Sequence, residues 1–63
     1  CAVFRQPGHI TLMRPTIHAI WSKWLPASGY VAAEAPLIEF YPSTFDPVTG
    51  HGGFEVWLPV RTL

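Results

Sequence analysis

A single carboxylate interrupts an apolar run near the C-terminus, in Gly53-Phe54-Glu55-Val56-Trp57-Leu58-Pro59-Val60. Because side chains alternate between the two faces of a strand, Glu55 and Trp57 share one face and the apolar residues around them share the other. An unpaired Glu in an ordinary core is destabilising, whereas a water-poor aromatic pocket gives both side chains a role. A bound cation would pair with the carboxylate and lie against the indole, a contact that contributes about 0.5 to 2 kcal/mol when desolvated. The alternative is a solvent-facing Glu55 on a half-buried strand, with Trp57 partly covered.

Further aromatic candidates for the lining of such a pocket are Trp21, Trp24, Tyr30 and Tyr41. The two Trp residues fall in an apolar pattern of helical spacing, which favours a place in the core over a ligand platform, although either could reach a pocket rim. The two Tyr residues carry a polar tip on an aromatic body, which suits a pocket wall and equally a domain surface.

No other pattern in the chain indicates a metal, a cofactor or a nucleophile. His9, His18 and His51 lack the paired spacing of metal ligands, and the single cysteine, Cys1, has no base near it in the sequence. The glycines do not reproduce a phosphate-loop or dinucleotide-binding pattern, which requires a strand, a glycine-rich turn and a helix in fixed order. We therefore expect neither a metal nor a cofactor, and we assign no catalytic residue.

Composition limits the chain to one small module. A chain of 63 residues buries only about 60% of the surface that its unfolded form exposes. Hydrophobic residues make up 49% of it and charged residues 13%, so we expect a partner to cover part of the apolar surface. A single cysteine cannot form an internal disulfide, which gives no support to secretion and favours a cytoplasmic location.

Two classes of partner are not expected. The formal net charge is zero, and the basic residues Arg5, Arg14, Lys23 and Arg61 are scattered, so this segment should make no direct contact with nucleic acid. No apolar run approaches the roughly 20 residues of a membrane span, so no membrane association is expected. The pattern around Glu55 instead favours a small molecule.

The first part of the chain predicts a strand followed by an amphipathic helix. Residues 1–5 are apolar strand formers, and the turn signal Gln6-Pro7-Gly8 follows them. Apolar residues then recur at spacings of three and four, which predicts a helix that begins near Thr11, its expected N-terminal cap, and ends around Leu25. Gly29 is placed to end the helix in a left-handed conformation.

The second part predicts two more strands. Residues 32–36 have the composition of a linker, and residues 37–41 form a strand with Ile38 and Phe40 on one face. A long connection rich in turn residues separates it from the third strand, residues 54–60. The prediction is an α+β fold of strand-helix-strand-strand order, in which one helix packs on a small, mostly antiparallel sheet and leaves its other face bare.

Several segments in this order resemble the C-terminal half of a GyrI-like effector-binding domain: Ala2-Val3-Phe4-Arg5, Gly8-His9-Ile10, Thr16-Ile17-His18-Ala19-Ile20-Trp21, Trp24-Leu25-Pro26, Ser28-Gly29-Tyr30 and Phe54 to Val60. The resemblance implies two strand-helix-strand-strand modules that are related by a pseudo-twofold axis and enclose an aromatic pocket for hydrophobic, often cationic, compounds. It assigns the family's pocket glutamate to Glu55 and the ligand-facing position two residues later to Trp57. Cys1 departs from the family, in which the first position is often aromatic.

The resemblance also implies that residues 1–63 are a single half-module. Such a half needs either a missing N-terminal half-module upstream or a second copy of itself in a homodimer. A symmetric dimer would bring two Glu55 side chains toward one cavity, where like charges raise the apparent pKa of the pair and favour a cation or a shared proton.

Domains of this family occur alone or fused to AraC-type and MerR-type transcription regulators. The first expectation is therefore a bacterial ligand-binding module of a transcription regulator or of a stand-alone multidrug sensor. One alternative is a hydrolase of the same family that uses Glu55 as its acid-base group, although the sequence offers no clear second catalytic residue. The other is a protein-interaction module related to gyrase-inhibitory proteins, for which a change at Glu55 would matter little.

Overall fold

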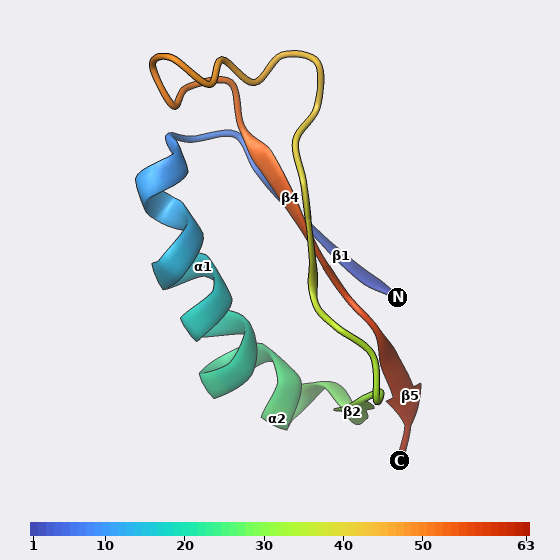
Figure 1. Ribbon diagram of the computed structural model, residues 1–63. Coiled ribbons are helices and arrows are strands. Elements are labelled where there is room, and N and C mark those ends of the chain that lie inside the picture. Colours follow the sequence, from blue (N-terminus) through green and yellow to red (C-terminus); the bar gives the residue numbers. More distant parts are fainter.

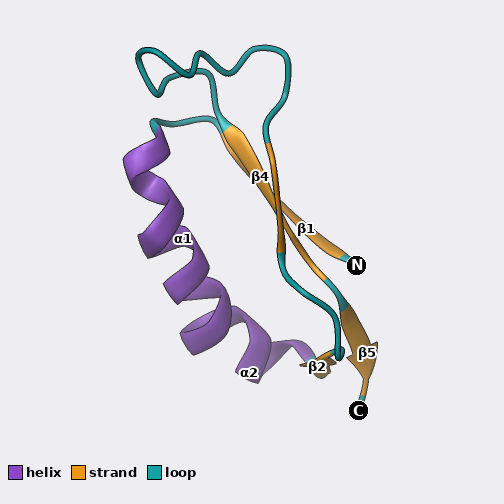
Figure 2. Ribbon diagram, viewed as in Figure 1, coloured by secondary structure: helices purple, strands orange, loops and turns teal.

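The computed structural model describes residues 1–63 and shows a helical segment lying along one face of a small antiparallel sheet (Figures 1 and 2). Strands β1 (Ala2–Gln6) and β3 (Ile38–Phe40) both pair antiparallel with β4 (Phe54–Leu58), which lies between them. The strand order is therefore β1-β4-β3, with β1 and β3 at the edges. The predicted α+β fold is confirmed. No helix has the length and apolar character needed to cross a membrane.

The helical segment is continuous but changes its winding along the way. It consists of a 3₁₀ turn, an α-helix, a π-helical turn and a final α-helical turn, namely η1 (Ile10–Leu12), α1 (Met13–Ala19), η2 (Ile20–Trp24) and α2 (Leu25–Ser28). In the π-helical turn, the amide of Leu25 donates to the carbonyl of Ile20, five residues earlier. This wider turn ends at Trp24, two residues before Pro26, which has no amide hydrogen to continue the regular helical pattern.

Both ends of the helix differ from the sequence prediction. At the start, Nδ1 of His9 accepts a hydrogen bond from the amide of Thr11 at 3.1 Å, so the cap is His9 and the prediction of Thr11 was wrong. At the other end, the helix continues for one turn past Leu25 and stops at Gly29, which has the expected left-handed φ of 80°. The helix passes Pro26 because the π-helical turn before it shifts the hydrogen bonds, so that a residue without an amide hydrogen is accommodated.

A second sheet of two strands forms the end of the molecule where the helix finishes. Strand β2 (Tyr30–Ala32) pairs antiparallel with β5 (Val60–Thr62), and the amide of Ala33 donates to the carbonyl of Pro59 at 2.9 Å. The sequence prediction missed β2 and treated residues 54–60 as one strand. Pro59 divides β4 from β5 because it has no amide hydrogen to donate to a neighbouring strand.

The core lies between the helical segment and one face of β4. Its five buried residues are Met13, Ile20, Phe54, Val56 and Leu58. The three on β4 alternate with the two less buried residues of that strand, which confirms the predicted alternation. Glu55 and Trp57 therefore lie on the face of the sheet away from the helix.

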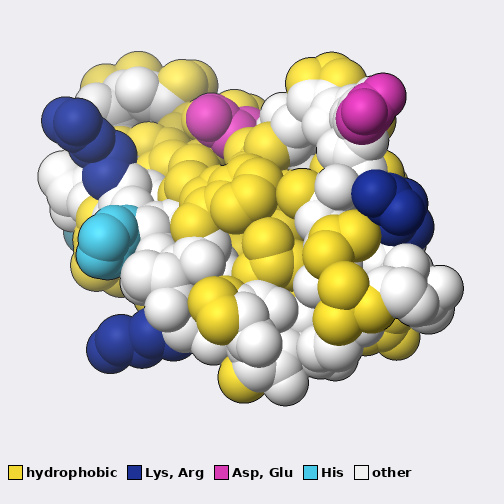
Figure 3. All heavy atoms as spheres, turned by 90° about the horizontal axis from the view of Figure 1, so that it is seen from below, with side chains coloured by type: hydrophobic (Ala, Val, Ile, Leu, Met, Phe, Trp, Pro, Cys, Tyr) yellow, Lys and Arg dark blue, Asp and Glu magenta, His cyan; other side chains and the backbone are white.

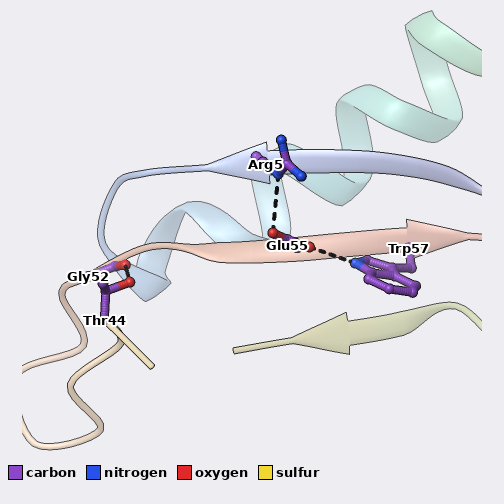
Figure 4. Close-up of polar contacts among 5 residues, drawn as sticks. All are labelled: Arg5, Thr44, Gly52, Glu55 and Trp57. Atoms are coloured by element: carbon purple, nitrogen blue, oxygen red, sulfur yellow. Dashed lines mark hydrogen bonds and ion pairs between the residues drawn. The ribbon is translucent and has the colours of Figure 1, made fainter. Parts of the chain in front are cut away.

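The connection between β3 and β4 folds back onto the start of the helix. The amide of Ile10 donates to the carbonyl of Gly50 at 2.7 Å, and the hydroxyl of Thr44 donates to the carbonyl of Gly52 at 2.9 Å (Figure 4). Gly52 has a φ of 106°, and a Cβ atom there would collide with the carbonyl oxygen of Thr44. These contacts fix the end of the connection from which β4 begins.

Candidate functional site

The face of the three-stranded sheet away from the helix, called here the outer face, combines apolar side chains with one acid and one base. The register of the strands places its residues in two rows, one of Arg5, Glu55 and Phe40 and the other of Val3, Trp57 and Ile38. Residues directly opposite each other on neighbouring strands lie on the same face and are in contact range. Val3, Ile38 and Phe40 are each close to half exposed, at 45%, 47% and 44%. The outer face is thus an uncovered apolar surface with a carboxylate at its centre.

The carboxylate of Glu55 accepts a hydrogen bond at each oxygen (Figure 4). The indole Nε1 of Trp57 donates to Oε1 at 2.8 Å, and Nε of Arg5 donates to Oε2 at 3.2 Å. The Glu55 side chain is only 17% exposed, whereas that of Arg5 is 82% exposed. The acid is therefore held by two donors, and the base that pairs with it lies largely in solvent.

Trp57 links the acid to the aromatic part of the outer face. Its indole is held by the hydrogen bond to Glu55, and its ring lies 5.8 Å from that of Phe40 at an angle of 31°. A depression of about 530 Å³ is lined by Val3, Arg5, Glu55 and Trp57. Small-molecule sites commonly have volumes of about 300 to 1,000 Å³. This surface can pair a positive charge with Glu55 and hold an aromatic ring against the indole.

Two of the predicted site residues, Trp24 and Tyr30, lie away from the outer face. Trp24 packs edge to face on Phe4 at 4.9 Å and lies parallel to Tyr30 at 6.3 Å. Phe4 is opposite Val56 in the sheet register, so Trp24 belongs to the side covered by the helix. Trp24 and Tyr30 line a separate depression of about 420 Å³ together with residues of β5. Seen from the end of the molecule where β2 and β5 lie, hydrophobic side chains gather at the centre and charged ones at the margin (Figure 3).

The other two predicted residues are also apart from Glu55. Trp21 lies on the helical segment and is 44% exposed. Tyr41 follows β3 and donates its hydroxyl to Oε1 of Glu39 at 2.9 Å. This hydrogen bond, followed by partial burial and the negative charge of Glu39, raises the pKa of Tyr41. Of the six predicted residues, the structure thus places only Glu55 and Trp57 together on the outer face.

Arg5 and Phe40 are part of the outer face but were absent from the predicted site. The alternation along residues 37–41 correctly placed Phe40 on the same face of its strand as Ile38. Sequence alternation does not say which residues of neighbouring strands lie opposite each other, and that register is what brings both side chains to Glu55.

Two of the three histidines, His9 and His51, lie together where the β3–β4 connection meets the start of the helix. The rings of His9 and His51 lie 4.6 Å apart, edge to face, and Nε2 of His9 is 2.8 Å from the carbonyl oxygen of Thr49. No group of three or more His, Cys, Asp or Glu side chains is arranged to hold a metal ion. His9 therefore has a structural part, in which it joins the β3–β4 connection to the start of the helix.

A helix thus covers one face of a small antiparallel sheet (Figure 1), while an acid and an indole occupy the open face. The family model for the GyrI-like small molecule binding domain matches residues 1–61, and the chain belongs to this family. A comparison with curated proteins finds no match, and a comparison with solved structures finds none either.

Proposed function

We propose that the outer face binds a hydrophobic cation, with Glu55 as its counter-ion and Trp57 and Phe40 as aromatic contacts. The observation that carries this proposal is the fixed, largely covered carboxylate of Glu55 in the middle of exposed apolar side chains. A purely apolar ligand would leave this charge without a partner other than Arg5. A purely polar ligand would gain nothing from Val3 and Ile38.

The expected specificity follows from the two kinds of contact. Cation–π attraction contributes about 0.5 to 2 kcal/mol and depends little on the detailed shape of the ligand. One acid beside the tilted rings of Trp57 and Phe40 therefore favours a range of flat, positively charged compounds over a single compound. A multidrug or effector sensor of a transcription regulator requires such broad specificity. We propose that the protein is a sensor of this kind.

We also propose that a second module covers the outer face. Small-molecule sites commonly bury 70–90% or more of a drug-sized ligand, whereas the depression beside Glu55 is open on one side. The cover would be an N-terminal half-module of the same protein or a second copy of this chain. A second copy would double the mass in solution, and a covalently linked half-module would not.

The test is calorimetric titration with N-methylquinolinium and with quinoline, which has nearly the same shape but no charge at neutral pH. Glu55→Gln should weaken binding of the cation by about tenfold or more, equivalent to about 1.4 kcal/mol, and leave quinoline unchanged. Glu39→Gln is the matched control because it removes the same charge from the neighbouring strand, opposite Val56 and so on the covered side of the sheet. Equal losses in the two variants, or no loss in Glu55→Gln, would rule the proposal out.

A further inference from the structure

We propose that Arg5 occupies the cation position of the site and sets its specificity, so that a cationic ligand binds by displacing the Arg5 guanidinium from Glu55. This inference rests on the proposed function, because it concerns the same carboxylate. It adds a second requirement, namely that a ligand must compete with a positive charge supplied by the protein itself.

The geometry around the carboxylate leaves one oxygen for this competition. Oε1 of Glu55 already accepts from Trp57, a neutral donor on the same strand. Oε2 accepts only from Arg5, which lies directly opposite Glu55 on β1. Figure 4 shows the carboxylate between the two donors, with the guanidinium on the β1 side. A ligand cation that approaches Oε2 therefore meets Arg5 first.

The Arg5 side chain is held weakly enough to leave. It contacts Glu55 through Nε alone, so the remaining N–H groups of the guanidinium make no bond to the acid. Its side chain is 82% exposed, and β1 is an edge strand, so no neighbouring strand confines it on the outside. Surface ion pairs contribute about 1 kcal/mol or less, and the base of this pair is largely in solvent, so we expect its displacement to weaken ligand binding by no more than about fivefold.

Such a competitor changes which compounds the site accepts. A small cation with little aromatic surface gains only the charge contact, which Arg5 already supplies to Glu55. A flat cation gains the contacts with Trp57 and Phe40 as well, which offset the loss of the ion pair. Arg5 thereby selects ligands that have both a positive charge and an aromatic surface.

The test measures binding of N-methylquinolinium and quinoline by the NMR shift of the Trp57 indole N–H, which is the hydrogen bonded to Glu55. Arg5→Gln should bind the cation about three- to fivefold more tightly and bind quinoline as before. Arg5→Lys, which keeps the positive charge, should stay closer to the unmodified protein. Arg14→Gln on α1 removes the same charge outside the site and should change neither affinity.

The outcomes separate this inference from the proposed function. If Glu55→Gln loses cation binding while Arg5→Gln binds no more tightly than the unmodified protein, Arg5 does not compete and only the inference is overturned. Weaker binding by Arg5→Gln would also overturn it, because Arg5 would then assist the ligand. If the unmodified protein does not bind the cation, or Glu55→Gln binds it equally well, both proposals fail.

Discussion

The carboxylate of Glu55 is oriented before any ligand arrives, because each oxygen already has a donor. Its partner at 2.8 Å is Trp57, two residues away on the same strand, and its partner at 3.2 Å is Arg5, on the edge strand. A group that is already ordered saves the ligand part of the entropic cost of binding. The two donors therefore have opposite effects at the site: Trp57 keeps the acid in place, while Arg5 competes for it.

Tyr41 provides a prediction about pH. Its hydrogen bond to Glu39 raises the pKa of the phenol above the ordinary value of 10.0. Because the pKa is higher in the folded protein than in the unfolded chain, the stability from this bond is fully present below about pH 10 and is lost as the pH rises through the raised pKa. The measurement is a pH titration of phenolate absorbance in the unmodified protein and in Tyr41→Phe. The difference between the two curves belongs to Tyr41, and its midpoint should lie above pH 10.0. A midpoint at or below that value would contradict the contact.

At the scale of elements, the β3–β4 connection depends on a glycine that no other residue can replace without rearrangement. Gly29 and Gly52 both have positive φ, but only Gly52 has a neighbouring backbone in the space of a Cβ atom. Gly29→Ala should lower the free energy of unfolding by about 1 to 2 kcal/mol through backbone strain alone. Gly52→Ala should lose clearly more, because Thr44 must also move. Urea denaturation of both variants measures this, and equal losses would argue against a tightly packed connection.

The arrangement of the elements was predictable where local patterns determine it. Alternation along residues 54–58 correctly separated the buried Phe54 and Val56 from Glu55, and apolar spacing located the helix. Of the outer face, alternation could predict only that Glu55 and Trp57 share one side of β4. Arg5 joins it through the register between β1 and β4, which depends on packing across the whole sheet.

Two other misses have local physical causes. Strand β2 (Tyr30–Ala32) has only three residues, too few for an alternating pattern to stand out, and it is stabilised by its pairing with β5. The extra helical turn after Leu25 depends on the π-helical turn before Pro26, which shifts the hydrogen bonds so that a proline is accommodated. Neither feature is visible in residue types alone.

At the scale of the whole molecule, the chain buries few residues for its high content of hydrophobic side chains. Only seven of its 63 residues are buried, and five of these are hydrophobic. The helix covers one face of the three-stranded sheet, and the outer face has no covering element (Figure 1). An exposed apolar face of this kind is a binding surface in many proteins, and here it contains the ion pair of the proposed site.

The measurement that tests the central claim most directly is a map of backbone and indole N–H shifts during titration with N-methylquinolinium. We predict that the largest changes fall on the outer face, at the Trp57 indole and at the amides around Glu55 and Phe40. Changes centred on Trp24 and Tyr30, in the depression on the other side of the sheet, would contradict the account and move the ligand to that site.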